Sequence, residues 1–146
     1  MSRIKRLWLL TVTANGNFAG TRAQLRLEIV SHSGERVWDD LGDPQQNDHE
    51  RGSTGCLELV LPEACNLDDT QIKEIRLRIH DGFDAWMPKS IWLMSENIDG
   101  GIKLLSANPD WNSWFDPESR PGYALRVLPE CQVSPETSLP QGGSPP

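Results

Sequence analysis

The sequence predicts an all-β protein, an eight-stranded antiparallel β-sandwich. Two observations lead to this fold class. Apolar and polar residues alternate with a period of two in most segments, which is the pattern of strands with one buried face. Turn-forming residues separate these segments at short intervals, and helical periodicity is scarce. The chain has 146 residues, which is enough for one domain with a core of its own.

The clearest strand is predicted at residues 23–31. Ala23, Leu25, Leu27 and Ile29 share one face there, and polar residues alternate with them. A Ser-Gly turn signal then leads into a returning strand. The expected strands, in chain order, are residues 4–13, 23–31, 35–38, 56–61, 73–80, 91–94, 102–105 and 123–128.

Two connections between the expected strands carry unusual chemistry. Residues 39–53 form a long polar segment with five acids among Gly and Pro. Residues 81–86 read Asp-Gly-Phe-Asp-Ala-Trp and place aromatic side chains in an acidic loop. Long loops in compact domains are usually functional or mobile. We therefore expect these connections to carry the binding residues.

The charge balance excludes one class of partner. The net charge is −7 at pH 7, and the isoelectric point is about 4.9. Nucleic-acid binding needs clustered Lys and Arg against phosphates, so we expect no nucleic-acid partner. Simple attraction to anionic lipid is also disfavoured, unless bound cations or a local basic patch reverse the sign.

The three cysteines, Cys56, Cys65 and Cys131, indicate a chain with reduced thiols. An odd number without closely spaced pairs fits neither a disulfide framework nor a zinc site. A Cys56–Cys65 bridge stays open as the alternative. The apolar run at residues 7–10 is too short for a signal peptide. We therefore expect a cytoplasmic protein, unless a dedicated route or a partner exports it.

The end of the chain differs in composition from the rest. From Pro129 onward it is rich in Pro, Ser, Gly and Gln and has almost nothing to bury. The predicted domain organisation is a sandwich over residues 1–128 and a disordered tail over residues 129–146.

Four motifs in order give the chain a family resemblance. They are Ala19-Gly20-Thr21; residues 38–42 with residues 47–54; residues 67–69 with residues 75–79; and residues 84–88 with residues 111–114. Together they resemble the PLAT (lipoxygenase-homology) domain family, and particularly the C-terminal membrane-binding domain of clostridial phospholipase C toxins. The resemblance implies a β-sandwich that attaches enzymes or toxins to membranes or to protein partners. It also implies that the domain binds and does not catalyse.

In that toxin group, loop acids and main-chain oxygens bind calcium, which bridges to lipid phosphates. The resemblance implies one site from Gly20, Asp84 and Ala85. It implies a second from Asp39, Asp40, Gly42 and either Asp43 or Asp48. Phe18 and Arg22 stand where the family has aspartates, and losing carboxylates weakens a calcium site. The alternative is that the loop acids are solvated and make local turns and caps.

The aromatic residues divide between packing and binding. Phe18 and Phe83 lie in polar loops with Trp86 close in sequence, so we expect these three residues at a membrane- or partner-binding edge. Strand positions favour burial of Trp8 and Trp92 in the core. Trp111 and Trp114 are also expected to pack.

No sequence motif indicates an enzyme. There is no Gly-x-Ser-x-Gly elbow, no phosphate-cradling glycine loop, and no metal-binding spacing among the three histidines. Two hypotheses therefore remain. The first is an adaptor for a protein partner, such as a separately encoded enzyme or toxin. The second is a lipid-binding module that acts with calcium.

Overall fold

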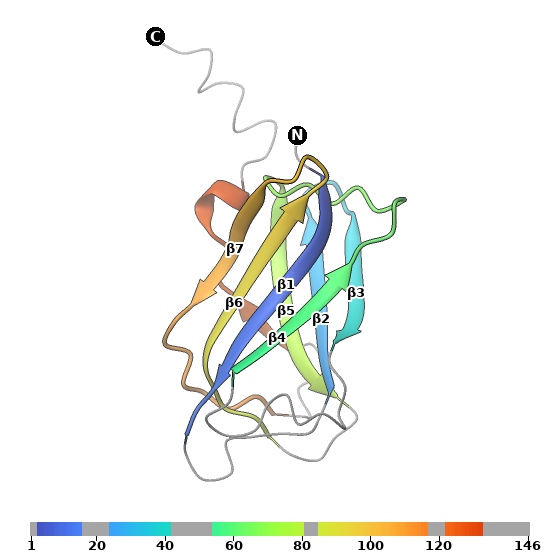
Figure 1. Ribbon diagram of the computed structural model, residues 1–146. Helices are drawn as coiled ribbons and strands as arrows, with labels where there is room; N and C mark the ends of the chain where they lie inside the picture. The colour runs from blue at the N-terminus through green and yellow to red at the C-terminus, as the bar shows by residue number, and fades with distance from the viewer. Residues whose placement is uncertain (1–2, 16–23, 42–53, 81–84, 117–121, 133–146) are drawn as a thin grey trace.

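The computed structural model describes residues 3–15, 24–41, 54–80, 85–116 and 122–132. Within these ranges, two four-stranded sheets pack face to face as a sandwich (Figure 1). Every pair of neighbouring strands is antiparallel. The predicted fold class is therefore confirmed.

The strand order in one sheet is β4-β1-β6-β7, and in the other it is β3-β2-β5-β8. The elements are β1 (Ile4–Thr13), β2 (Gln24–Ser31), β3 (Arg36–Leu41), β4 (Thr54–Val60), β5 (Ile72–His80), β6 (Pro88–Asn97), β7 (Ile102–Asn108), β8 (Tyr123–Leu125) and a short 3-10 helix η1 (Pro129–Cys131).

The core lies between the sheets and follows the period-two pattern of the sequence. Leu25, Leu27 and Ile29 of β2 are buried, and in register they lie opposite Ile79, Leu77 and Ile75 of β5. The other sheet contributes the alternate residues of β1 and β6. Fully burying one such aliphatic side chain contributes about 1.5–3 kcal/mol to folding, so this two-sided core holds the sandwich together.

The two ends of the sandwich differ in how their connections are built. We call "the lower end" the end at which β1, β3, β5 and β7 terminate, drawn at the bottom of Figure 1. At the upper end, β6 and β7 are joined by a tight turn whose Gly101 carbonyl accepts from the Asn97 amide at 2.8 Å. The Asn97 side chain also donates to buried Asp69 at 2.6 Å. These bonds fix the upper end.

Strand β3 is longer than the sequence predicts. The polar segment was expected to begin at Asp39, but β3 continues to Leu41. Asp39, Asp40 and Leu41 pair with Leu27, Arg26 and Leu25 of β2. The ladder to a strong neighbouring strand overrides the weak strand propensity of aspartate.

The expectation that Trp8 and Trp92 lie in the core is wrong. Both are only half-buried, and both lie on the outer face of their sheet. Leu7 and Leu9 take the inner positions on β1, so alternation turns Trp8 outward. The Arg6 guanidinium lies 5.8 Å from the centre of the Trp8 ring.

The ordered domain extends past the predicted boundary at residue 128. Cys131 in η1 is completely buried, and its thiol donates to the Leu104 carbonyl at 3.5 Å. Residues 129–132 therefore belong to the sandwich and not to a tail. The rest of the predicted tail, residues 133–146, lies outside the described residues.

Candidate functional site

The fold brings the predicted binding segments to the lower end. Four connections join strands at this end: residues 14–23 between β1 and β2, 42–53 between β3 and β4, 81–87 between β5 and β6, and 109–122 between β7 and β8. This shared position follows from the strand directions. Successive strands of the chain run in opposite directions, so every second connection lies at the same end. Every site residue expected from the sequence lies in one of these connections or in the last residues of β3.

Few of those expected residues can be placed individually. Asp39 and Asp40 are paired strand residues within two positions of the end of β3. Ala85 is half-buried. The residues that lie outside the described part of the chain are Phe18, Gly20, Gly42, Asp43, Asp48, Phe83 and Asp84.

Trp86 was expected at the binding edge, and the structure corrects this. Its side chain is completely buried. The indole nitrogen donates to the Thr13 hydroxyl at 2.9 Å, and its backbone exchanges two hydrogen bonds with Phe115, at 3.1 and 2.6 Å. Trp86 therefore closes the lower end of the core and cannot contact a partner from this position.

The chain around Trp86 forms an aromatic cluster. Phe115 lies 5.3 Å from Trp86 and 4.7 Å from Tyr123, measured between ring centres. The Trp111 ring also lies 5.3 Å from that of Phe115, measured between ring centres. The Trp111 amide donates to the Lys89 carbonyl at 2.9 Å, which ties this segment to the start of β6. Trp111 is therefore a packing residue, as the sequence predicts.

Trp114 was expected to pack, but 46% of it is exposed. It directly precedes buried Phe115, and Asn112 adopts a positive φ of 47° just before it. This local turn presents the indole to solvent at the lower end. Tryptophan is enriched at protein interfaces and among the residues that contribute most to binding. Trp114 is thus a candidate binding residue that the sequence interpretation missed.

A second exposed tryptophan lies on the outer face of the other sheet, in the first half of β3. Trp38 of β3 is 39% exposed. The guanidinium groups of Arg26 and Arg78 lie 5.4 and 5.5 Å from its ring centre. The two arginines face each other across β2 and β5, two residues from the strand ends. This cluster places two positive charges against an exposed indole in an otherwise acidic chain.

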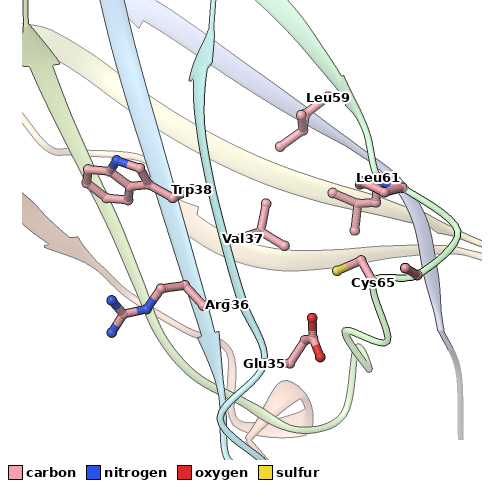
Figure 2. Close-up of a pocket in the computed structure, with 9 residues that line it drawn as sticks. Glu35, Arg36, Val37, Trp38, Leu59, Leu61 and Cys65 are labelled. Carbon is pink, nitrogen blue, oxygen red and sulfur yellow. The ribbon is translucent and has the colours of Figure 1, made fainter.

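A groove opens beside Trp38, along the edge where β3 and β4 come together. It has a volume of about 350 Å³. Figure 2 shows Val37, Leu59, Leu61 and Cys65 turned into this space, with Glu35 at one mouth. The lining is mainly apolar, so the groove suits an apolar group and offers a single carboxylate.

The thiol in this groove is poorly suited to nucleophilic chemistry. Burial raises the pKa of Cys65, and the pKa of Cys131 is raised by burial as well. Both groups therefore remain protonated at neutral pH. All three cysteines are free, so the Cys56–Cys65 bridge is not formed.

We expect thiol labelling to separate the three cysteines. In the native protein, one equivalent of Ellman's reagent should react quickly at exposed Cys56. Cys65 and Cys131 should react only after unfolding, since both are buried and their raised pKa values suppress the thiolate. Peptide mass spectrometry identifies the labelled residue. Rapid native labelling of all three would contradict the burial described here.

The described residues contain no group of three His, Cys, Asp or Glu side chains that could hold a metal. Within the same ranges, no helix is long and apolar enough to span a membrane.

A family profile described as the PLAT/LH2 domain matches residues 9–129. No curated protein sequence gives a match. Among solved structures, the alpha-toxin of Clostridium absonum aligns with a TM-score of 0.71 at 22% identity, over 86% of this chain and 32% of the toxin. An alpha-toxin from an avian strain of Clostridium perfringens aligns with a TM-score of 0.67 at 19% identity, over 86% and 32%.

Coral 8R-lipoxygenase has the same fold, with a TM-score of 0.58 at 17% identity over 84% of this chain and 17% of the enzyme. Calcium activation through a C2-like domain is described for that lipoxygenase. This chain therefore spans about a third of the toxins and about a sixth of the lipoxygenase. The family profile covers most of the sandwich, and the fold agrees with it. The chain belongs to the PLAT/LH2 domain family of binding modules.

Proposed function

We propose that this domain attaches to a membrane surface or a protein partner through the lower end of the sandwich, without catalysing a reaction. The observation that carries the proposal is the exposure of Trp114 at the end where the three predicted binding segments leave the strands. A side chain this large and apolar favours removal from water.

The Arg26–Trp38–Arg78 cluster supports a membrane as the target. Indole rings favour the interface between water and lipid. Each arginine near an anionic membrane contributes roughly 1 kcal/mol of attraction. The cluster brings two guanidinium groups to the exposed Trp38 indole in a chain whose net charge is −7. The same exposed aromatics also suit a protein interface, where Trp and Arg are enriched.

Calcium is the further component of this proposal. Asp39 and Asp40 lie near the end of β3, and Ala85 lies just before β6, so parts of both predicted sites flank the lower end. Calcium takes six to eight oxygen ligands, and a bound ion would add positive charge for phosphate groups. The candidate ligands remain Asp39, Asp40, Gly42 and Asp43 or Asp48 at one site, and Gly20, Asp84 and Ala85 at the other.

Vesicle co-sedimentation tests the membrane target. The full chain is pelleted with phosphatidylcholine–phosphatidylserine vesicles in excess calcium and in chelator. Binding only with calcium supports the loop acids as ligands, and Asp40→Asn should then abolish it. Binding in both conditions supports aromatic and arginine contacts alone. Absence of binding in both conditions rejects these lipids as the target and leaves the protein partner.

We expect Trp114→Ala to weaken vesicle binding about tenfold, because burying a large apolar side chain contributes about 1.5–3 kcal/mol. Ile98→Ala is the matched control, since Ile98 is 58% exposed but lies in the turn at the upper end. Titration with vesicles measures both affinities. Equal losses for the two variants, or no loss for Trp114→Ala, would contradict attachment through the lower end.

A further inference from the structure

The groove between β3 and β4 is bordered by an open strand edge. Among the strands that the structure describes, β3 is the last in its sheet, so only one side of its backbone pairs with a neighbour. The turn before β3 fixes which groups face that neighbour, because the Ser31 amide donates to the Glu35 carbonyl at 2.9 Å. Bonded residues alternate along an antiparallel ladder. The backbone of Val37 therefore faces β2, and the amide and carbonyl groups of Arg36 and Trp38 point to the open side.

The two sides of the groove offer different chemistry. Arg36 and Trp38 both line it, although Figure 2 shows their side chains turned away from Val37, so their backbone groups border the groove. On the β4 side, the lining consists of the Leu59 and Leu61 side chains. The Leu61 backbone is turned to β1, since its amide donates to a carbonyl of that strand at 3.0 Å. One side thus presents hydrogen-bonding groups and the other presents aliphatic side chains.

Strand β3 lacks common devices that block pairing at a sheet edge. It contains no proline or lysine, and its register with β2 is free of bulges. An extended segment that pairs with such an edge gains main-chain hydrogen bonds, and its alternate side chains enter the neighbouring groove. The groove volume of about 350 Å³ lies near the lower end of the range for ligand pockets, about 300–1,000 Å³. It therefore suits a few side chains.

The charge at the groove favours a cationic partner. The Glu35 carboxylate lies at one mouth of the groove. Within the described part of the chain Glu35 forms no ion pair, and the guanidinium of neighbouring Arg36 pairs with Glu28 at 3.1 Å. Residues 35–41 contain three acids and one arginine. A fatty-acid carboxylate would be repelled there, and the same edge of a second copy would bring acids against acids.

We propose that the β3 edge binds an extended peptide segment of a partner protein as an added antiparallel strand. An aliphatic residue of the peptide lies opposite Val37, and a lysine or arginine two positions away lies opposite Glu35. Both side chains enter the groove, because every second residue of a strand points to the same face. The antiparallel direction is the more stable pairing. The site is at the start of β3, away from the lower end, and does not depend on the proposed attachment there.

Amide-resolved NMR of the isotope-labelled full chain tests this inference. The probe is the acetylated and amidated peptide Thr-Lys-Thr-Leu-Thr-Lys-Thr, which places leucine opposite Val37 and a lysine opposite Glu35. We expect the amide protons of Arg36 and Trp38 to move downfield as they gain acceptors. The Val37 amide, which already faces β2, should move less. Replacing both lysines of the peptide by glutamate should weaken binding at least about fivefold.

Arg36→Pro tests the backbone contact directly. It removes an N–H group that β2 does not use, and proline is accepted on an edge strand at such a position. Arg36→Ala is the matched control, because it loses the same side chain and ion pair but keeps the N–H group. We expect Arg36→Pro to bind the peptide at least about tenfold more weakly than Arg36→Ala. Circular dichroism verifies that both variants fold. If Arg36→Pro does not fold, N-methylation of the two threonines beside the leucine removes the peptide's donors to β3 and should weaken binding equally.

Three results would overturn the inference. The first is no shift at Arg36 and Trp38 with millimolar peptide, including the case in which decanoate shifts the groove residues instead and assigns them to a lipid chain. The second is equal peptide affinity of the proline and alanine variants. The third is a shift of the same two amides with protein concentration alone, which would assign the edge to a second copy. Trp114→Ala should leave peptide affinity unchanged, so failure here is distinguishable from failure of attachment through the lower end.

Discussion

Replacing Trp86 with alanine is expected to lower the free energy of unfolding by about 3–5 kcal/mol. Trp86 is completely buried, contacts Phe115, and donates to Thr13 at 2.9 Å. The substitution leaves a large cavity and removes the donor to a buried hydroxyl group. Because the free energy of unfolding of a small domain is only about 5–15 kcal/mol, the substitution would remove a large share of it. Urea unfolding followed by circular dichroism measures the change.

Trp114→Ala is the matched control for this prediction, because Trp114 is exposed at the same end of the sandwich. Its free energy of unfolding should stay within about 0.5 kcal/mol of the wild type. A similar destabilisation by the two substitutions would contradict the assignment of one tryptophan to the core and the other to the surface.

Gly122→Ala is expected to destabilise the protein by at least about 2 kcal/mol. Gly122 adopts a φ of +72°, and an added Cβ would lie 2.7 Å from the Leu77 carbonyl oxygen and 2.8 Å from the Arg78 Cβ. Both neighbours belong to the central strand β5, so the contact cannot be relieved by moving a flexible side chain. The carbonyl of Gly122 also accepts from the Arg76 guanidinium at 2.9 Å. Thermal unfolding and urea titration both measure the loss.

Gly34→Ala separates the clash from the backbone effect. Gly34 has a similar φ of +90°, but nothing lies within 4 Å of the added Cβ. Gly34→Ala should lower the free energy of unfolding by only about 1–2 kcal/mol, which is the cost of holding an L-residue in the left-handed backbone region. If Gly122→Ala were no more damaging than Gly34→Ala, the close packing of Gly122 on β5 would be wrong.

The strands were predictable because one-sided burial leaves a period-two pattern in the sequence. The bounds expected for residues 4–13 and for the strand ending at Ser31 agree closely with β1 and β2. The pattern is less informative where both faces are apolar. In residues 7–10 and 91–94, alternation cannot show which residues face the core, and Trp8 and Trp92 were placed on the wrong side for this reason.

The arrangement of the lower end was predictable only in part. Turn composition located the connections, and alternating strands bring them to one end. The burial of Trp86 and of Trp114 was predicted the wrong way round, because both lie in segments without periodicity. Burial there depends on long-range partners, Thr13 and Phe115 for Trp86, which a local pattern does not contain. The Arg26–Trp38–Arg78 cluster likewise requires the register of three strands.

Hydrogen–deuterium exchange of the whole chain, with and without phosphatidylcholine–phosphatidylserine vesicles in calcium, tests attachment through the lower end most directly. We expect the vesicles to protect backbone amides of residues 109–116 and the start of β2, and to leave the upper turn at residues 97–102 unchanged. Bound protein that is protected at residues 97–102, with no change at residues 109–116, would contradict attachment through the lower end.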